Sequence, residues 1–119
     1  MRNDVPVNLS PPALRYRADR LLVAREIRDV AINVVVATLD EAKRLHRFHA
    51  DSQGLAPNEH TLTRLAITFR HDCAKIRDKF LAKKEEIDTE AQRLEDRLLD
   101  QRIKTAEMRT STCDYGATG

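Results

Sequence analysis

Three of the chain's four histidines, His46, His49 and His60, lie close together in the sequence, in the only stretch whose residue types suggest a metal site. His46 and His49 are three residues apart and would share one face of a helix. With a carboxylate from Asp51 or Glu59, these imidazoles could complete a Zn²⁺ shell. The spacing matches no established zinc motif, however, and the dipole of a helix already favours histidines near its C-terminus. We therefore expect no bound metal, and we keep the three histidines as the metal-ligating candidates.

The residues around these histidines also fit the end of one helix, a short loop and the start of another. Gly54 suits the left-handed conformation that follows a last helical turn, and Leu55 can then fold back onto the helix. Pro57 cannot continue the preceding helix. Asn58 is a good N-cap, and Glu59 places an acid in the first turn, where the helix dipole favours one. We therefore interpret this stretch as a turn.

Two long segments without internal glycine or proline flank the turn, and they are the most informative feature of the sequence. The first helix is expected over about 11–52, because Ser10 is a good N-cap and Pro11 suits the first helical position. The loop is expected over 53–57, and the second helix over about 58–110. Leu9, which precedes the N-cap, can pack against Leu14 and so fix the entry of the chain into the first helix.

This pattern predicts an all-α fold class. Two long antiparallel helices would form a helical hairpin or coiled coil as a single domain, residues 1–119, with an irregular N-terminal arm and an irregular C-terminal tail. Charged residues make up 34% of the chain and aromatic residues 4%, which is typical of long helices that meet along narrow seams. Cys73 and Cys113 form no metal or redox motif, and we expect both to be free thiols.

The second helix carries apolar residues in alternating steps of four and three, the heptad stripe of a coiled coil. The stripe consists of Leu62, Ala66, Phe69, Cys73, Ile76 and Phe80, and it continues through Ile87, Leu94 and Leu98. It predicts knobs-into-holes packing against another helix. If this helix overhangs the first, Leu94, Leu98, Leu99, Ile103 and Met108 would have no cover from within the chain.

Residues 30–39 of the first helix are apolar on nearly every face and rich in β-branched side chains. A strand is the alternative for this segment. We expect a helix, because no turn signal bounds the segment and a helical pattern continues on both sides. A helix that is apolar on several faces must be covered on several faces, and one neighbouring helix covers only one of them. The segment therefore predicts contact with a second copy of the chain or with another protein.

The expected interface combines this segment with the heptad stripe of the second helix. Its residues are Val30, Ile32, Val34, Val35, Val36, Leu39, Leu62, Phe69, Ile76, Phe80, Leu94 and Leu98. The second helix is also divided by charge. Residues 64–84 hold seven bases and two acids, whereas residues 85–100 hold seven acids and two bases. A neighbour of opposite polarity, such as an antiparallel or staggered second copy, would satisfy both blocks, although an ordinary solvated helix face remains open as an interpretation.

Several function classes find no support in the residues. There is no phosphate-binding glycine loop, no Cys-x-x-Cys, no G-x-S-x-G and no Glu-x-x-His pair, so we expect no enzyme and no cofactor. No apolar stretch is long enough to span a bilayer, and no tryptophan-bearing amphipathic helix suggests a membrane partner. Nucleic acid remains a partner to consider, because the basic block 64–84 could contact phosphates, but the adjacent acidic block would repel them.

We therefore expect a non-catalytic structural subunit that oligomerises with itself, or docks on other subunits, in a larger multi-copy assembly such as a phage particle or a secretion or injection machine. It would be located in the cytoplasm or within an assembled particle such as a virion. An adaptor or chaperone that binds the apolar helix of a client protein is the second hypothesis. Nucleic-acid binding through residues 64–84 is the third.

Overall fold

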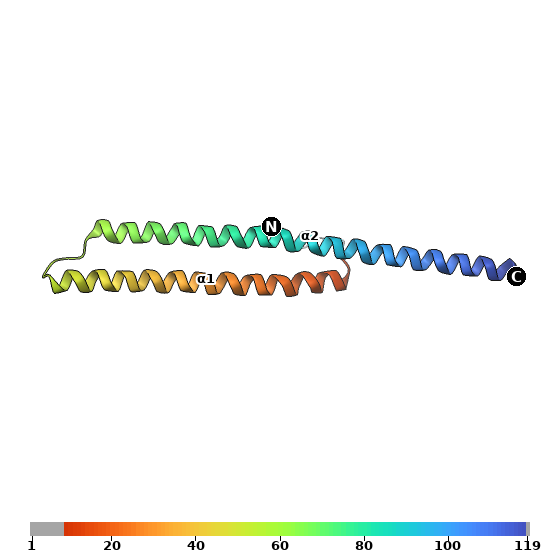
Figure 1. Cartoon of the computed structure of the whole chain (residues 1–119), viewed down its shortest axis with the longest axis horizontal. Helices are drawn as coiled ribbons and strands as arrows, with labels where there is room; N and C mark the ends of the chain where they lie inside the picture. The colour runs from red at the N-terminus through yellow and green to blue at the C-terminus, as the bar shows by residue number, and fades with distance from the viewer. Residues whose placement is uncertain (1–8, 119) are drawn as a thin grey trace. The chain divides into compact units, whose positions relative to one another are not determined.

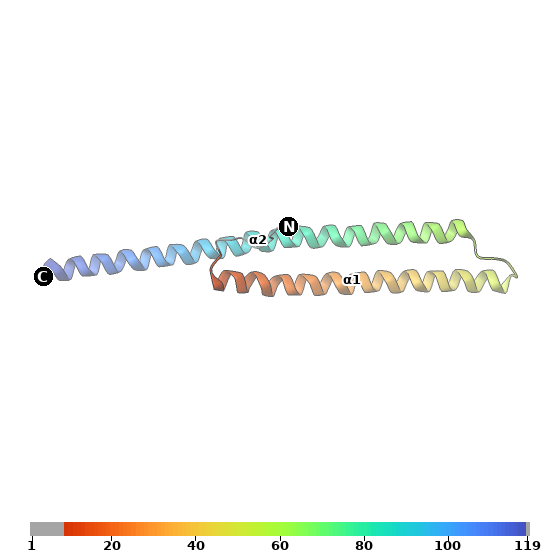
Figure 2. The ribbon, with the colours of Figure 1, turned by 180° about the vertical axis from the view of Figure 1, so that it is seen from behind.

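A computed structural model describes the backbone of residues 9–118 and the side chains of residues 9–109. It contains two α-helices, α1 (Pro11–Ser52) and α2 (Glu59–Thr118), and the described residues form no strand. Within each of the compact units described below, the segments of α1 and α2 lie side by side in opposite directions, and a short loop joins the two helices (Figures 1 and 2). The predicted all-α helical hairpin is confirmed, and the strand alternative for residues 30–39 is not adopted because that segment lies inside α1. The expected N-terminal arm lies mostly outside the described residues.

The end of α2 differs from the expectation of an irregular C-terminal tail after about residue 110, because the helix continues to Thr118. The residues beyond 110 include no proline, and the first glycine after the loop is Gly116. A single glycine costs a helix only about 1 kcal/mol relative to alanine, so an established backbone hydrogen-bond ladder can pass through it. The start of α1 at Pro11 and its end at Ser52 agree with the expected bounds.

The chain divides into two compact units, which are described separately. Unit 1 combines the start of α1 with the second half of α2 (Met1–Arg20 and Glu85–Gly119). Unit 2 is continuous in sequence (Leu21–Lys84) and contains the rest of α1, the loop and the first half of α2.

Unit 1 is held by a small apolar cluster. Leu9, Ala13 and Ala91 are buried together, and Leu14 and Leu94 are partly buried against them. The contact of Leu9 and Leu14 with the same cluster agrees with the expected hydrophobic pairing across the N-cap. Because this cluster also includes Leu94, that residue has cover from within its own chain, contrary to the expectation that it would be left uncovered on an overhang.

Unit 2 packs along a narrow seam of small and half-buried side chains. On α1, Leu21, Ala24 and Ala50 are buried, and the half-buried residues between them continue the same face: Arg28, Ala31, Val35, Leu39, Ala42 and His46. Alanines let two helices approach closely but bury little area. Leu21, at 3% exposure, is the one buried side chain larger than alanine among the described residues of unit 2.

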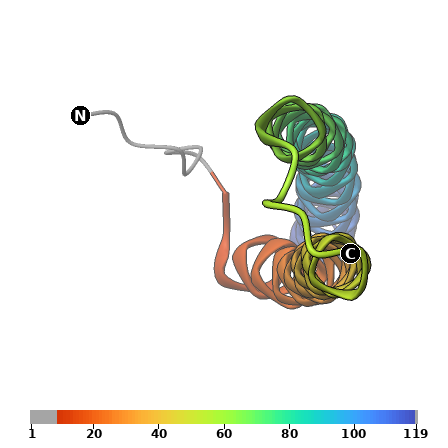
Figure 3. The same cartoon turned by 90° about the vertical axis from the view of Figure 1, so that its left-hand side faces the viewer.

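The loop of unit 2 has the geometry that the sequence predicts. Gly54 adopts a φ of 70°. Its N–H donates to the carbonyl of Asp51 at 3.0 Å, while the N–H of Leu55 donates to the carbonyl of Ala50 at 2.8 Å, the pair of bonds that defines a Schellman ending. Asn58 then caps α2, because its Oδ1 accepts hydrogen bonds from the backbone N–H groups two and three residues later. Figure 3 shows this loop in a view along the helices.

Candidate interaction surface

The expected interface residues separate into two groups in the structure. Nine are half-buried, and they lie on the faces with which α1 and α2 meet: Ile32, Val35, Leu39, Leu62, Phe69, Ile76, Phe80, Leu94 and Leu98. Val30, Val34 and Val36 are exposed, with 62%, 60% and 38% of their surface accessible. One neighbouring helix therefore covers one face of residues 30–39 and leaves other apolar positions open.

The exposed apolar residues of α1 in unit 2 continue well beyond the segment that the sequence singled out. Six of them form what we call the outer stripe: Val23, Ile27, Val30, Val34, Leu45 and Phe48. Each is between 43% and 66% exposed. The first four follow one another in steps of four, three and four, which is the spacing of a coiled-coil seam. The outer stripe is therefore a second seam with no partner among the described residues.

The position of the outer stripe around α1 follows from its numbering. Val23, Ile27, Val30 and Val34 each precede by one residue a position that faces α2. One residue corresponds to about 100° of rotation around an α-helix. The outer stripe therefore lies about a quarter turn away from the face that packs on α2. Leu45, which precedes the half-buried His46, continues the stripe along the same side.

The interface expected from the sequence does not include Val23, Ile27, Leu45 and Phe48 of the outer stripe. In the sequence, residues 30–39 form one apolar block. In the structure, the outer stripe is a second heptad series, shifted by one residue from the series that faces α2. Two series on one helix can be separated only when the face that packs inside the chain is known. The exposed Val36 lies away from the outer stripe, on the other flank of α1.

Three charged residues and one asparagine border the outer stripe on the side away from α2. Glu26, Asn33, Asp40 and Arg47 recur every seven residues and are all exposed. In the described part of the chain no ion pair involves Glu26, Asp40 or Arg47. This line, called the outer flank below, begins with an acid and ends with a base.

One polar pair interrupts the outer stripe itself. Arg44 donates two hydrogen bonds to the carboxylate of Glu41, from Nε at 3.0 Å and from Nη2 at 2.6 Å. These bonds lower the pKa of Glu41 and raise that of Arg44. Because the two charges neutralise each other, a partner helix that covers this point would meet a compact ion pair rather than a lone charge.

The acidic block of α2 has partners within unit 1 that the sequence pattern does not predict. Arg17, which is only 6% exposed, donates from Nε to Oδ1 of Asp88. Glu90 accepts a hydrogen bond from the hydroxyl of Tyr16 at 3.2 Å and lies 3.8 Å from the guanidinium of Arg20. The basic start of α1 thus compensates part of a block for which the sequence suggested a second copy.

A carboxylate of the same block lies at the N-terminus of α1. Oε1 of Glu95 accepts a hydrogen bond from the backbone N–H of Ser10 at 2.9 Å, and its Oε2 lies 3.5 Å from Arg102. The hydroxyl of Ser10 and then its backbone N–H lower the pKa of Glu95, and Arg102 acts in the same direction. Because the N-terminus of a helix is electropositive, this position stabilises the charged form of the carboxylate.

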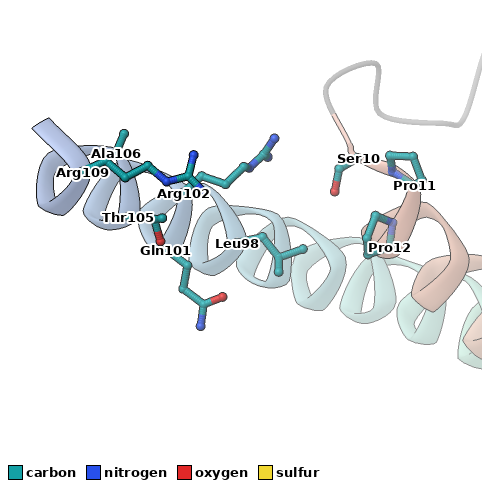
Figure 4. A pocket seen from close by; sticks show the side chains of 9 residues that line it. All are labelled: Ser10, Pro11, Pro12, Leu98, Gln101, Arg102, Thr105, Ala106 and Arg109. Carbon is teal, nitrogen blue, oxygen red and sulfur yellow. The ribbon is translucent and has the colours of Figure 1, made fainter. Parts of the chain in front are cut away.

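Next to this contact, unit 1 has an open groove of about 740 Å³. In Figure 4 the start of α1 forms one end of the groove and the side chains of α2 form the rest. Its lining residues are Ser10, Pro11, Pro12, Leu98, Gln101, Arg102, Thr105, Ala106 and Arg109. Leu99, Ile103 and Met108 of the same part of α2 are exposed, in agreement with the expectation of an apolar overhang.

The three candidate histidines are not arranged as a metal site. Nε2 of His46 accepts a hydrogen bond from the backbone N–H of Asn58 at 2.9 Å, so this imidazole ties the end of α1 to the start of α2. The ring of His49 lies edge-on to Phe48, with 6.3 Å between centroids. His60 is exposed in the first turn of α2. Among the described residues, no group of three or more histidine, cysteine, aspartate or glutamate side chains could hold a metal ion.

Cys73 is a half-buried free thiol on the seam of α2, and the side chain of Cys113 lies outside the described residues. Neither helix, over its described residues, has a segment long and apolar enough to cross a membrane. Comparison with protein-family models, with curated proteins and with solved structures finds no match to this chain.

Proposed function

We propose that this chain is a non-catalytic structural subunit that associates through helical seams in a multi-copy assembly. The outer stripe of α1 is the observation that carries this proposal. It places six large apolar side chains in solvent along one line of a helix whose other face already packs on α2. Isolated exposed hydrophobic residues are ordinary on protein surfaces, whereas several that line up on one side of a helix are typical of an interaction site.

The free energy available from burying the outer stripe favours association. Full burial of one large aliphatic side chain is worth about 1.5–3 kcal/mol, so six half-exposed side chains represent a substantial part of the stability of a small helical protein. The seam of unit 2, made mostly of alanines and half-buried residues, supplies little area by comparison. A long two-helix hairpin with such a seam benefits from a further layer of helices, because most of the stability of a helix comes from tertiary packing.

Light scattering behind a sizing column, at low and at high salt, tests this function. The proposal expects a defined oligomer or a larger particle from the purified chain alone, with uniform mass across the peak. Salt should change that mass if charges on the outer flank or on the basic block of α2 contribute. A monomer that persists over a wide concentration range contradicts self-association and leaves an adaptor as the better function.

The adaptor or chaperone hypothesis has its own observation, the groove at the start of α1. A client helix laid along Leu98 in this groove could also reach Leu99 and Ile103 of the same helix, which are 46% and 49% exposed. An adaptor of this kind would be a monomer or dimer that changes mass only when a client is added. The same light-scattering measurement therefore separates the two functions.

A further inference from the structure

We propose that the outer stripe of α1 binds the outer stripe of a second copy of this chain, with the two α1 helices antiparallel and the two-fold axis close to Val34 and Ala37. This inference rests on the proposed function and specifies its partner, surface and orientation. It concerns unit 2 alone, which contains the whole outer stripe.

The angle between the two seams of α1 supports a further helical neighbour. In a four-helix bundle each helix packs against two neighbours that lie about a right angle apart around its axis. The outer stripe lies about 100° from the face that contacts α2, because its residues precede the inward ones by one position. A two-helix chain provides half of such a bundle, and a second copy provides the other half.

The extent of the outer stripe fixes the register of an antiparallel pair. When the stripe is laid against itself so that its ends coincide, Val23 faces Phe48 of the second copy. Val34 then faces Ala37 of the second copy, which is also exposed. The Glu41–Arg44 ion pair falls between these layers, opposite Ile27 and Val30, and its aliphatic stems can cover them while the charges neutralise each other.

Charge on the outer flank selects the antiparallel orientation. In the same register Glu26 lies opposite Arg47 of the second copy, and by symmetry this pair occurs twice. Asn33 lies opposite Asp40, where an amide can donate to a carboxylate. In a parallel pair, identical residues of the two copies would instead lie at the same height, so that Glu26 would be near Glu26 and Arg47 near Arg47. Flanking charges of this kind set orientation in coiled coils.

Site-directed disulfide formation tests both the surface and the orientation. Cys73→Ala and Cys113→Ser provide a background without native thiols, in which single cysteines replace Val23, Val34 or Phe48. Val34→Cys should form a covalent dimer under mild oxidation, because its copies lie next to the two-fold axis. Val23→Cys should not link to itself, since its copies are roughly 37 Å apart along the helix, but it should link to Phe48→Cys when the two proteins are mixed.

Leu81→Cys in the same background is the matched control, because Leu81 is comparably exposed but lies on α2. It should remain uncrosslinked under the same conditions. Circular dichroism of each variant establishes that the helices are intact. Self-linkage of Val23→Cys and Phe48→Cys would show a parallel pair and overturn the proposed orientation, and linkage of Leu81→Cys alone would overturn the proposed surface.

Charge exchange gives an independent test. Glu26→Arg and Arg47→Glu should each raise the dimer Kd several-fold, because each places like charges opposite each other twice. The double variant restores both pairs in swapped form and should regain most of the affinity. Additive losses in the double variant would contradict the proposed contact.

Failure of this inference is distinguishable from failure of the proposed function. If light scattering reports an oligomer while Val34→Cys stays unlinked and the charge exchange has no effect, the subunit assembles through another surface and the outer-stripe pairing is wrong. If the chain is a monomer under all conditions, both the function and the pairing are wrong.

Discussion

The backbone N–H of Ser10 donates a hydrogen bond to Oε1 of Glu95 at 2.9 Å, so a carboxylate of α2 lies at the first turn of α1. The contact joins residues 85 positions apart in the sequence and connects the two helical segments of unit 1. It satisfies a donor that precedes the helix, and it places a negative charge where the dipole of α1 is positive. It therefore specifies how the start of α1 lies along α2.

Glu95→Gln should lower the stability of unit 1 and remove part of its dependence on pH. The pKa of Glu95 is lowered in the folded state, so its stabilising contribution is present above the pKa of the unfolded chain and is lost as the pH falls through the folded value. Urea titrations of both proteins at neutral pH and at successively more acidic pH check this. The wild type should lose more stability in acid than the variant, and parallel losses would contradict a charged role for Glu95.

The Arg17–Asp88 pair should matter more than the neighbouring Arg20–Glu90 pair. Arg17 is nearly buried and donates a charge-assisted hydrogen bond, so Arg17→Ala should cost about 1–3 kcal/mol. Arg20 is 48% exposed on its side chain and 3.8 Å from Glu90, a geometry worth about 0–1 kcal/mol. Double-mutant cycles on both pairs provide the measurement. Equal coupling energies would show that burial of Arg17 does not strengthen its contact.

The loop could be predicted residue by residue, because its determinants are local. A glycine at the C′ position, an N-cap asparagine and a proline between them each act through their own backbone geometry. Gly54 and Asn58 adopt the predicted roles for that reason. The long segments without glycine or proline similarly define where helices run. The helix α2 extends beyond the predicted end at about residue 110, because the polar residues that follow carry no strong helix-stop signal.

The partners of the charged blocks could not be predicted in this way. Asp88 and Glu95 lie on one side of the buried positions Ile87 and Ala91 of α2, and Glu90 lies on the other side. The contacts of these acids depend on the register in which α1 lies against α2. A shift of α1 by one turn would exchange these partners without changing any local signal. The outer stripe could not be predicted for the same reason. Ile27 is identified as outward-facing only once its neighbour Arg28 is known to face α2. The guanidinium carbon of Arg28 lies 4.6 Å from the centroid of the Phe80 ring.

Gly54→Ala should destabilise the loop by about 1–2 kcal/mol through backbone strain alone. The residue has a φ of 70°, which an L-residue adopts at a cost, and no atom lies within 4 Å of the position that an added Cβ would occupy. Gly54→Asn should cost less, because asparagine tolerates the left-handed region. Thermal unfolding of the three proteins checks the order, and a larger loss in the asparagine variant would point to a steric rather than a conformational cause.

His46→Ala should cost about 0.5–1.5 kcal/mol, because it removes the acceptor for the N–H of Asn58. His49→Ala and His60→Ala should leave stability nearly unchanged, since neither imidazole has a comparable hydrogen bond among those described. Elemental analysis of the purified proteins should detect no stoichiometric metal in any of them. A metal that is present in the wild type and lost in all three variants would restore the zinc interpretation of this loop.

Val34→Asp and Val35→Asp are adjacent substitutions that should have different effects. Val35 is half-buried on the face that meets α2, so a carboxylate there should weaken the hairpin itself, by about 3 kcal/mol, and lower its helicity on heating. Val34 is 60% exposed on the outer stripe, so the same change should leave the helicity of the single chain intact and abolish association. Circular dichroism and light scattering on the two proteins separate folding from assembly. If Val34→Asp keeps the full mass of the wild type, the outer stripe is not the surface through which the chain associates, and if Val35→Asp melts like the wild type, α1 does not use this face to pack on α2.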